Sequence, residues 1–398
     1  MRISELKISQ SPIQADWIRA SREVRFSSGE QQSYWFDLPS HCEPWVSRFP
    51  DPWVVALFPI ASKLGENIAV GEDTDALLIE NLAGISRIWT SWYSWVQPIS
   101  IEAPRRMSDK VAPRKGASFF SGGVDSFFSL IRHNNVLIGT ADQCVSDIIT
   151  VWGFDIPLSS RAEFDKLHRS AADVAQAYGK NLIPLATNLR ICDEVYAHHW
   201  PQLGFGAALA TVGHLLAGKF QSIIIGSSGD YGRLYPWGSH PMVDPLFSAR
   251  NLKIFHDSSS FTRVQKTEFI SAHPVALEHL HVCWINGSAS NCSRCTKCLR
   301  TMVTLDLLGA RDRAKTFDWS DYSLRKVADA HLGALSEINL FLEIRDEAAA
   351  RGRADIASAI DESIRRSRYR RVALSALDQL PSPALKWYGK KLMRLTQY

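Results

Sequence analysis

Residues 118–126 read Ser-Phe-Phe-Ser-Gly-Gly-Val-Asp-Ser, and this stretch predicts a strand, a glycine turn and a helix. An apolar run ends at Phe120, two glycines follow, and from Val124 the apolar positions recur at helical spacing. Two adjacent glycines let the backbone bend tightly and turn several N–H groups toward one anion, and the N-terminus of the following helix adds roughly half a positive charge. The stretch therefore predicts a phosphate-binding loop, although an ordinary capped turn between a strand and a helix would use the same residue types.

Three side chains in this stretch have the chemistry that a phosphate site needs. Ser121 and Ser126 can donate hydroxyl hydrogen bonds to phosphate oxygens, and Asp125 can cap the helix or help to hold a metal on the phosphates. The stretch lacks the lysine of a P-loop and the third glycine of a dinucleotide-binding fingerprint. We therefore expect neither phosphorylation nor hydride transfer.

After this stretch the chain alternates strand-like and helix-like segments. Strand-like runs occupy residues 146–152, 181–186 and 222–226, and helical patterns occupy residues 160–178 and 204–217. Such alternation predicts an α/β fold with a parallel five-stranded sheet covered by helices on both faces. Ligands of such sheets bind at the carboxyl ends of the strands. The polar turns expected to meet at that edge are residues 121–123, 153–155, 187–188 and 226–228.

The regions before and after these alternating segments differ from them in composition and in residue pattern. Residues 1–115 are rich in Trp and Pro and predict a small α+β N-terminal domain, with a strand at 53–58 and a helix at 75–95. The basic stretch at 103–115 is expected to link it to a central domain at 116–308. Residues 309–398 predict a helical C-terminal region, with helices at 320–347, 355–376 and 383–396.

Composition favours an ordinary globular chain. The 398 residues include no run of 18 apolar residues and no apolar leader at the start, so we expect a cytoplasmic protein with no membrane partner. The net charge is +4, and the basic excess lies after Ala310. Five arginines stand between positions 365 and 371 around Tyr369, a pattern that fits either an RNA-binding patch or a solvated helix face.

Four of the seven cysteines stand close together, at the spacing C-x8-C-x2-C-x2-C. These residues are Cys283, Cys292, Cys295 and Cys298. The spacing places three thiolates around one tight turn and returns a fourth from a short loop, which suits tetrahedral Zn²⁺. Sets of four cysteines also hold iron–sulfur clusters, so that alternative stays open.

The Ser-Gly-Gly-Xaa-Asp-Ser motif of residues 121–126 resembles the pyrophosphate-binding loop of the N-type ATP pyrophosphatases, which cleave ATP to AMP and pyrophosphate. With the four cysteines downstream, residues 118–308 resemble the 7-cyano-7-deazaguanine synthase family. The resemblance implies an adenine nucleotide alpha hydrolase-like, Rossmann-like fold that uses ATP, Mg²⁺ and zinc. It implies a C–N bond-forming ligase that adenylates a carboxylate, which ammonia or an amine then attacks.

The resemblance also assigns roles to individual residues. The ATP-binding residues that it implies are Ser121, Gly122, Gly123, Val124, Asp125, Ser126, Phe154 and Lys266. Of these, Asp125, Ser126 and Lys266 are expected to act in catalysis. Lys266 is similar to the lysine that opens a helix after the last strand and contacts phosphate, although a single Lys on a helix is usually solvated.

The chain departs from the family in its two extra regions and in the segment before the cysteines. Substrate contacts are expected there from Tyr231, Arg233, Trp237, His240 and Asp244, which could stack on a ring and pair a carboxylate. Packing of a surface loop would explain the same residues. His256 and Asp257 could form an acid–base pair, although adjacent residues often point apart, and Cys192 could be a sulfur carrier or a small core residue.

The leading hypothesis is ATP-dependent adenylation of a carboxylate or carbonyl oxygen, in a substrate such as a 7-deazapurine, followed by nitrogen attack. One alternative is an RNA-modifying or thiolating enzyme of the same superfamily. A second, by resemblance to synthase-like proteins of defence systems, is a ligase that joins a deazapurine to a protein bound through residues 1–115. A third is a nucleotide-binding protein without turnover. A homodimer is a further hypothesis.

Overall fold

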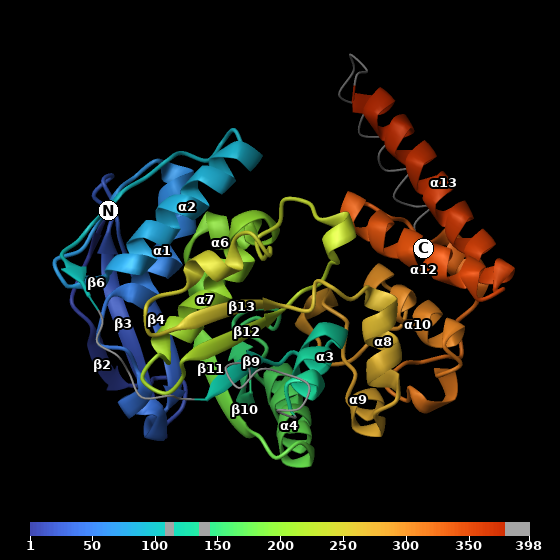
Figure 1. The fold of residues 1–398 in the computed structure, drawn as a ribbon, viewed down its shortest axis with the longest axis horizontal. Coiled ribbons are helices and arrows are strands. Elements are labelled where there is room, and N and C mark those ends of the chain that lie inside the picture. Colours follow the sequence, from blue (N-terminus) through green and yellow to red (C-terminus); the bar gives the residue numbers. More distant parts are fainter. Residues whose placement is uncertain (108–114, 135–143, 379–398) are drawn as a thin grey trace. The chain divides into compact units, whose positions relative to one another are not determined.

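The computed structural model describes residues 1–107, 115–134 and 144–378. They belong to two compact units, the first formed by Met1–Phe261 with Asn286–Ala289 and the second by Thr262–Ile285 with Ser290–Tyr398 (Figure 1). The expected boundaries at 115 and 308 fall inside these units. The N-terminal region shares a unit with the glycine turn, and the four cysteines share a unit with the C-terminal helices.

The first unit is built on a mixed sheet of eleven strands, counted among the described residues. Five neighbouring strands at one end run parallel, in the order β13 (Lys253–Asp257), β12 (Ser222–Gly226), β9 (Gly116–Phe119), β10 (Val145–Trp152) and β11 (Asn181–Thr187). The α/β class is therefore confirmed. The expectation of a purely parallel five-stranded sheet is wrong, because N-terminal strands continue the same sheet beyond β11.

The continuation starts where β4 (Gln31–Pro39) pairs antiparallel with β11, and β3 (Trp17–Arg25) then pairs with β4. Side chains that follow β11 extend this pairing. The Asn188 Oδ1 atom accepts a hydrogen bond from Trp35 N at 2.9 Å, and its Nδ2 atom donates to Ser33 O at 2.8 Å. The remaining strands of the sheet are β1 (Arg2–Ile3), β2 (Lys7–Gln10), β5 (Ile68–Ala69) and β7 (Ile101–Glu102). The N-terminal strands are thus part of the main sheet.

The stretch expected to be a linker contributes a strand. β8 (Arg105–Arg106) pairs with β6 (Thr74–Asp75) in a separate two-stranded sheet. Residues 108–114 of that stretch lie outside the described residues.

Helices lie on both faces of the parallel strands. α3 (Val124–Arg132) follows β9, α4 (Arg161–Ala177) follows β10, and α7 (Phe205–Leu215) precedes β12. Successive residues of a strand point to opposite faces. On β10, Val151 packs against the cluster that contains α7, whereas Trp152 stacks on Phe164 of α4, with ring centroids 5.3 Å apart. The helices α4 and α7 therefore cover opposite faces, as the alternation predicted.

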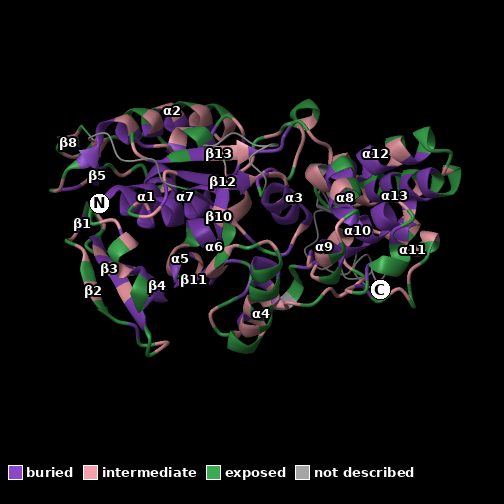
Figure 2. Cartoon of the chain, turned by 60° about the horizontal axis from the view of Figure 1, so that its bottom comes forward, coloured by how far each residue is buried: buried purple, intermediate pink, exposed green. Residues whose placement is uncertain are grey.

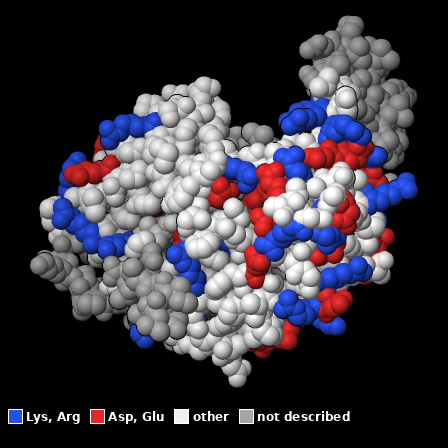
Figure 3. All heavy atoms as spheres, turned by 45° about the vertical axis from the view of Figure 1, so that its right-hand side comes forward, with Lys and Arg blue, Asp and Glu red and all other residues white. Residues whose placement is uncertain are grey.

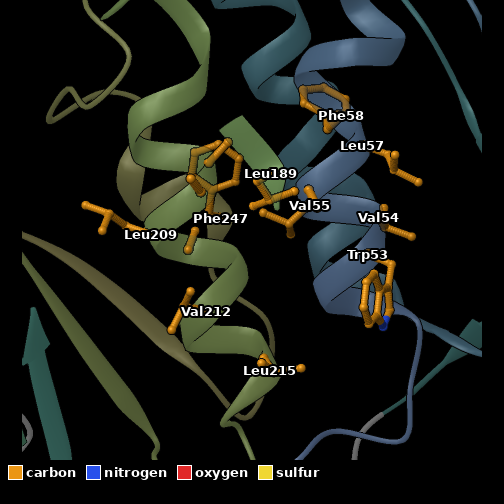
Figure 4. Close-up of a cluster of buried hydrophobic side chains, with 14 of the residues drawn as sticks. Trp53, Val54, Val55, Leu57, Phe58, Leu189, Leu209, Val212, Leu215 and Phe247 are labelled. Atoms are coloured by element: carbon orange, nitrogen blue, oxygen red, sulfur yellow. The ribbon is translucent and has the colours of Figure 1, made fainter. Parts of the chain in front are cut away.

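A large apolar core forms where α1 (Asp51–Leu64) packs beside α7, and Figure 4 shows the side chains between them. The expected strand at 53–58 is wrong, because these residues belong to α1. They are buried on every side of the helix, so the sequence carries no amphipathic period there. Pro52 in the first turn and Gly65 with φ 69° after the last residue are ordinary helix start and stop signals.

The other helices of the first unit complete this layer. The expected helix at 75–95 is confirmed as α2 (Ala76–Trp92), which begins where the Asp75 side chain accepts a hydrogen bond from Leu78 N. Short helices α5 (Leu189–Cys192) and α6 (Glu194–His198) and a π-helical turn at Trp200–Gly204 lead from β11 into α7. Figure 2 shows the strands β10 and β12 and the helix α7 as buried.

The second unit is helical. Its helices are α8 (Arg263–Ser271), α9 (Pro274–Glu278), α10 (Thr296–Leu307), α11 (Leu324–Asp329), α12 (Leu335–Ala350) and α13 (Ala354–Asp378), around a core that includes Val303, Phe341 and Ile360. The expected helix at 355–376 is confirmed. The one expected at 320–347 is wrong as a single element, because the chain leaves the helical conformation between α11 and α12. The one expected at 383–396 lies outside the described residues.

Candidate functional site

The glycine turn has the local structure that its sequence predicts. β9 leads through Ser121, Gly122 and Gly123 directly into α3. Gly122 has φ 76°, a left-handed conformation that favours glycine. The Ser121 Oγ atom accepts a hydrogen bond from Gly123 N at 3.4 Å, and the Ser126 hydroxyl donates to Gly123 O at 2.9 Å. Both serines therefore brace the turn, and Ser121 is also exposed to solvent.

The first turn of α3 is held against the end of β12. A Cβ atom at Gly226 would lie 3.1 Å from Asp125 O and 3.2 Å from Ser129 Oγ, so glycine allows this close approach. The Ser228 hydroxyl, just after β12, donates a hydrogen bond to Asp125 Oδ2 at 3.4 Å. These contacts place the Asp125 carboxylate between the glycine turn and the loop after β12.

This place is the point at which the strand order reverses. From β9 the chain adds β10 and β11 on one side, and then adds β12 and β13 on the other side. The loops after β9 and β12 leave the sheet in opposite directions there, and open α/β sheets bind ligands in the resulting crevice. The glycine turn and Ser227–Gly229 therefore occupy the position where this class of sheet binds its ligand.

A buried ionic network ties α3 to the end of β13. The Asp257 carboxylate accepts hydrogen bonds from Ser129 Oγ at 2.7 Å and Ser258 Oγ at 2.5 Å, and it lies 3.0 Å from His133 Nε2. Burial raises the pKa of Asp257, but the hydrogen bonds from His133, Ser258 and Ser129 outweigh burial and lower this pKa to about 2. Asp257 is therefore a structural anchor for α3.

The expected pairing of His256 with Asp257 is wrong. The two residues are neighbours on β13, so their side chains point to opposite faces. His256 instead places its Nδ1 atom 2.7 Å from Asp244 Oδ2. The Asp244 side chain is completely buried and also accepts hydrogen bonds from Ser239 Oγ at 2.6 Å and from His240 N at 3.2 Å. Asp244 thus organises the segment around residues 239–244.

A cavity opens beside this pair. It is lined by Ser227, Ser228 and Gly229 after β12, His256 of β13, Phe205 of α7, and the segment that includes Arg233, Tyr235, Trp237 and His240. Within the described part of the chain, the His256 Nε2 atom is buried and has no hydrogen-bond partner. Sequence spacing offered no signal for the pairing of His256 with Asp244, because they come from different elements and only the fold brings them together.

The five expected substrate residues take three different positions. Arg233, Trp237 and His240 line the cavity. Asp244 lies behind it, where it holds His256 and His240. Tyr231 is 59% exposed and is not among the lining residues. His240 stacks edge-on against Trp92, with ring centroids 4.9 Å apart, and burial followed by the nearby His256 lowers its pKa.

The other expected nucleotide-binding residues lie in the core or in the second unit. Phe154 is buried and packs on Trp200, with ring centroids 5.1 Å apart. Val124 is fully buried, so only its backbone is available to a ligand. Lys266 belongs to the second unit, near the start of α8, and its side chain is also buried.

Cys192 has the environment of a structural thiol. It is half-buried, and its Sγ atom accepts a hydrogen bond from Gln32 Nε2 at 3.2 Å. Burial raises its pKa to about 11. Because the thiolate is the reactive form, this environment argues against a role as sulfur carrier.

The four cysteines of the second unit converge and could hold a metal such as zinc. All four sulfur atoms lie within 4.8 Å of one another, and the pairs Cys283–Cys295 and Cys292–Cys298 are each 3.9 Å apart. A tetrahedral zinc with sulfur at ~2.3 Å requires sulfur atoms about 3.8 Å apart. The observed spacing therefore fits zinc.

The backbone around the cluster supports this arrangement. Backbone N–H groups of Cys295 and Cys298 donate to the sulfur atoms of Cys292 and Cys295, at 3.3 Å and 3.4 Å. Asn291 holds the segment before Cys283, because its Oδ1 atom accepts from Val282 N and its Nδ2 atom donates to Leu280 O. The hydrogen bond between Cys295 and Cys298 lowers the pKa of Cys295 and raises that of Cys298, and burial raises the pKa of Cys283. Metal ligands need the deprotonated form, so metal binding at this cluster would release protons.

The arginine-rich part of α13 is partly neutralised. Arg365 and Arg366 both form ion pairs with Glu362, and Arg366 also pairs with Asp329. On the face shown in Figure 3, Lys and Arg side chains are interspersed with Asp and Glu. These pairs favour the solvated helix face over a continuous RNA-binding patch.

Among the described residues, no helix has the length and apolar character needed to cross a membrane. The chain was also compared with models of protein families, with curated proteins and with solved structures, and none of them matches it.

Proposed function

We propose that this protein is an ATP pyrophosphatase, which cleaves ATP to AMP and pyrophosphate and transfers AMP to a carboxylate or carbonyl oxygen of its substrate. One observation carries the proposal. The Ser121-Gly122-Gly123 turn joins β9 to α3 where the strand order reverses, and Ser228 holds Asp125 beside it. The same residues carry the resemblance to the N-type ATP pyrophosphatases.

The order of the five parallel strands supports the proposal. With β9 in the middle, the five parallel strands follow the order of a doubly wound core, within a sheet that is mixed as a whole. Such cores place a nucleotide across the crevice at the reversal point. The N-terminal strands continue the sheet from the edge of this core, where β4 pairs with β11.

The turn fits the phosphates of ATP. The backbone N–H groups of Gly122 and Val124 and the exposed Ser121 hydroxyl would hold the pyrophosphate portion at the N-terminus of α3. Ser126 would act through the turn, since its hydroxyl is bonded to Gly123 O. Mg²⁺ on the phosphates, held in part by Asp125, would neutralise charge on the departing pyrophosphate.

Zinc at the four cysteines would have a structural role. It would join the segment of Cys283 to the start of α10, where Cys295 caps the helix. Four thiolate ligands leave no open position for a substrate, so the site is closed. An iron–sulfur cluster remains the alternative, and analysis of the bound metal would distinguish it from zinc.

The environment of Cys192 favours nitrogen over sulfur as the atom that attacks the activated carbonyl. Thiolation would need a reactive thiol, and the Cys192 thiol has a raised pKa. Attachment to RNA would use a continuous basic surface, and Arg365 and Arg366 are paired with acidic residues. The leading proposal therefore stays a C–N bond-forming ligase of a carboxylate substrate, with ammonia or an amine as donor.

ATP turnover with Mg²⁺ tests the proposal, with AMP resolved from ADP. We would add 7-carboxy-7-deazaguanine and ammonia together, singly and not at all. Release of AMP and pyrophosphate only in the presence of the deazapurine would support a synthase-like substrate. The same rate of AMP release with and without the deazapurine would support ATP pyrophosphatase chemistry but exclude that substrate. Formation of ADP instead of AMP would refute the proposed ATP pyrophosphatase activity.

The Asp125→Asn variant makes the test specific for the site. The amide keeps the size of the side chain but removes the negative charge that would hold Mg²⁺, so AMP formation should be abolished. The thermal unfolding midpoint should stay near that of the wild type, because Asp125 is only partly buried. Binding of ATP without AMP formation by the wild type would instead favour a nucleotide-binding protein without turnover.

A further inference from the structure

We propose that His256, oriented by Asp244, is the general base that takes a proton from the nitrogen nucleophile during attack on the adenylated substrate. The inference rests on the proposed function and adds to it the residue that handles the proton. It starts from the contact between His256 Nδ1 and Asp244 Oδ2, which is 2.7 Å long, and from the cavity beside them.

The geometry of the pair determines which nitrogen can accept a proton. A carboxylate accepts hydrogen bonds, so the Asp244 oxygen is best satisfied when Nδ1 of His256 carries the proton. The other ring nitrogen, Nε2, then has a free lone pair. In the described chain this atom is buried without a hydrogen-bond partner, and His256 is one of the residues that line the cavity. A buried acceptor without a partner is costly unless a ligand supplies a donor.

Asp244 is itself fixed in place. Its carboxylate accepts from Ser239 Oγ and from His240 N, and a Cβ atom at Gly206 of α7 would lie 2.6 Å from its Oδ1 atom. The glycine therefore lets α7 pack directly against the carboxylate. An aspartate held in this way can orient the imidazole and stabilise the imidazolium that forms when Nε2 takes a proton.

Among the described residues, the charged groups near the ring are one carboxylate and one guanidinium, and the guanidinium of Arg233 lies 3.7 Å from the Asp230 carboxylate. Asp244 faces the ring from the 3₁₀ turn at Asp244–Phe247, and His240 and Arg233 line the same cavity. Asp257 points to the other face of β13, toward His133. Burial, followed by the nearby His256, lowers the pKa of His240, which favours the neutral form of that ring.

The hydroxyls of the cavity are bonded elsewhere, which leaves His256 as the base rather than part of a serine triad. The Ser227 hydroxyl donates to Gly229 O at 2.6 Å and accepts from Ser259 Oγ at 2.9 Å, and Ser228 donates to Asp125. A covalent acyl-serine step would need one of these hydroxyls to donate to His256 Nε2.

The proposed step forms one C–N bond and breaks one C–O bond. The lone pair of ammonia or an amine attacks the carbonyl carbon of the acyl adenylate and forms the C–N bond. The proton that the nitrogen must lose passes to His256 Nε2. The bond between that carbon and the phosphate oxygen breaks, and AMP leaves with its electron pair. The products are an amide, AMP and an imidazolium paired with Asp244.

Nitrogen NMR of the full chain labelled at histidine tests the geometry without substrate. The expected spectrum assigns a protonated Nδ1 and an unprotonated Nε2 to His256, with the signal identified by its loss in His256→Asn. The asparagine amide can replace the Nδ1 donor to Asp244, so this variant should fold. A protonated Nε2 in the neutral ring would overturn the proposal.

Kinetics of the same variant test the role. We would compare pyrophosphate–ATP exchange, which reports adenylation of 7-carboxy-7-deazaguanine, with ammonia-stimulated AMP release. His256→Asn should keep the rate of pyrophosphate–ATP exchange within about twofold of the wild-type rate. It should lower the rate of ammonia-stimulated AMP release by ~100-fold or more, which is the usual contribution of a general base. His41→Asn, at an exposed position on the same unit, is the matched control and should change neither rate.

The outcomes separate the two proposals. A wild type that forms no AMP refutes the proposed function, and this inference with it. A wild type that forms AMP while His256→Asn loses nothing, or loses both rates equally, refutes only the role of His256. Wild-type AMP release that ammonia does not stimulate would overturn that role as well.

Discussion

Gly226 and Asp125 approach each other so closely that a single methyl group would not fit between them without a shift. A Cβ atom at Gly226 would lie 3.1 Å from the carbonyl oxygen of Asp125. The end of β12 thereby sets the position of the first turn of α3, on which the proposed phosphate site depends. Gly226→Ala should push α3 outward by a few tenths of an ångström.

This displacement predicts a larger effect on activity than on stability. AMP formation should fall about tenfold, because small misplacements of binding groups are costly in catalysis. The free energy of unfolding should fall by only about 1 kcal/mol. Enzyme assays and urea denaturation measure the two effects, and Gly71→Ala is the control because its Cβ atom would meet no atom within 4 Å. Wild-type activity in Gly226→Ala would refute the dependence of the site on this contact.

Gly206→Ala should be more harmful. Its Cβ atom would lie 2.4 Å from Gly238 O and 2.6 Å from Asp244 Oδ1, so the backbone of the cavity segment or the buried carboxylate must move. We expect a loss of roughly 2–4 kcal/mol in the free energy of unfolding, as for other overpacked core sites. Denaturant titration would measure it. A loss under about 0.5 kcal/mol would mean that α7 and Asp244 are less tightly packed than described.

Cys295→Ser should remove the metal and destabilise the second unit. Three thiolates and a hydroxyl hold zinc poorly, and structural zinc supplies ~10 kcal/mol or more of folding free energy in small domains. Elemental analysis should find zinc in the wild type and little in the variant, and the unfolding transition of the second unit should move to lower temperature.

Cys144→Ser is the matched control for this substitution, since Cys144 belongs to the first unit and is not one of the four clustered cysteines. It should keep the metal. Full zinc content and full stability in Cys295→Ser would show that the site assignment is incorrect, and visible absorbance of the purified protein would point to an iron–sulfur cluster.

Asp257 predicts a pH dependence of stability. Its pKa is lowered to about 2 in the folded chain, below the value of about 3.9 in unfolded chains. The group therefore stabilises the fold above the unfolded pKa, and this stabilisation is lost as pH falls toward 2. Between pH 5 and pH 3 the loss amounts to about 1 kcal/mol.

Comparison with Asp257→Asn isolates this contribution. The difference in unfolding free energy between wild type and variant should shrink by about 1 kcal/mol over that pH range, in urea titrations at several pH values. A difference that stays constant with pH would mean that the hydrogen bonds from Ser129, Ser258 and His133 do not favour the charged carboxylate.

Local patterns in the sequence predicted the elements whose structure depends on near neighbours. The turn at Ser121–Gly123 was predicted because two adjacent glycines permit a tight bend, and the runs that form β10 and β12 are rich in β-branched residues. The four cysteines were predicted as a metal site because three of them follow one another with two intervening residues each, at positions 292, 295 and 298. Each of these signals is contained within a short stretch of chain.

Other features depend on contacts that no short stretch contains. The run at 53–58 is a helix because α7 and its neighbours bury every side of it, which removes the amphipathic period that identifies a helix. The N-terminal strands join the main sheet because the backbone edge of β11 is paired by β4. Local propensity does not report which edge a strand will pair with.

The partner of His256 in the cavity wall likewise could not be predicted from a short stretch of sequence. Sequence proximity suggested that His256 pairs with Asp257, yet the alternation of side chains along β13 turns them apart. His256 meets Asp244 instead, and Asp257 meets His133. The sequence by itself determined the residue types and the phosphate-loop turn, because their signals are local. Only the tertiary structure decided which carboxylate orients the histidine, because that choice depends on how β13, α7 and the cavity segment pack.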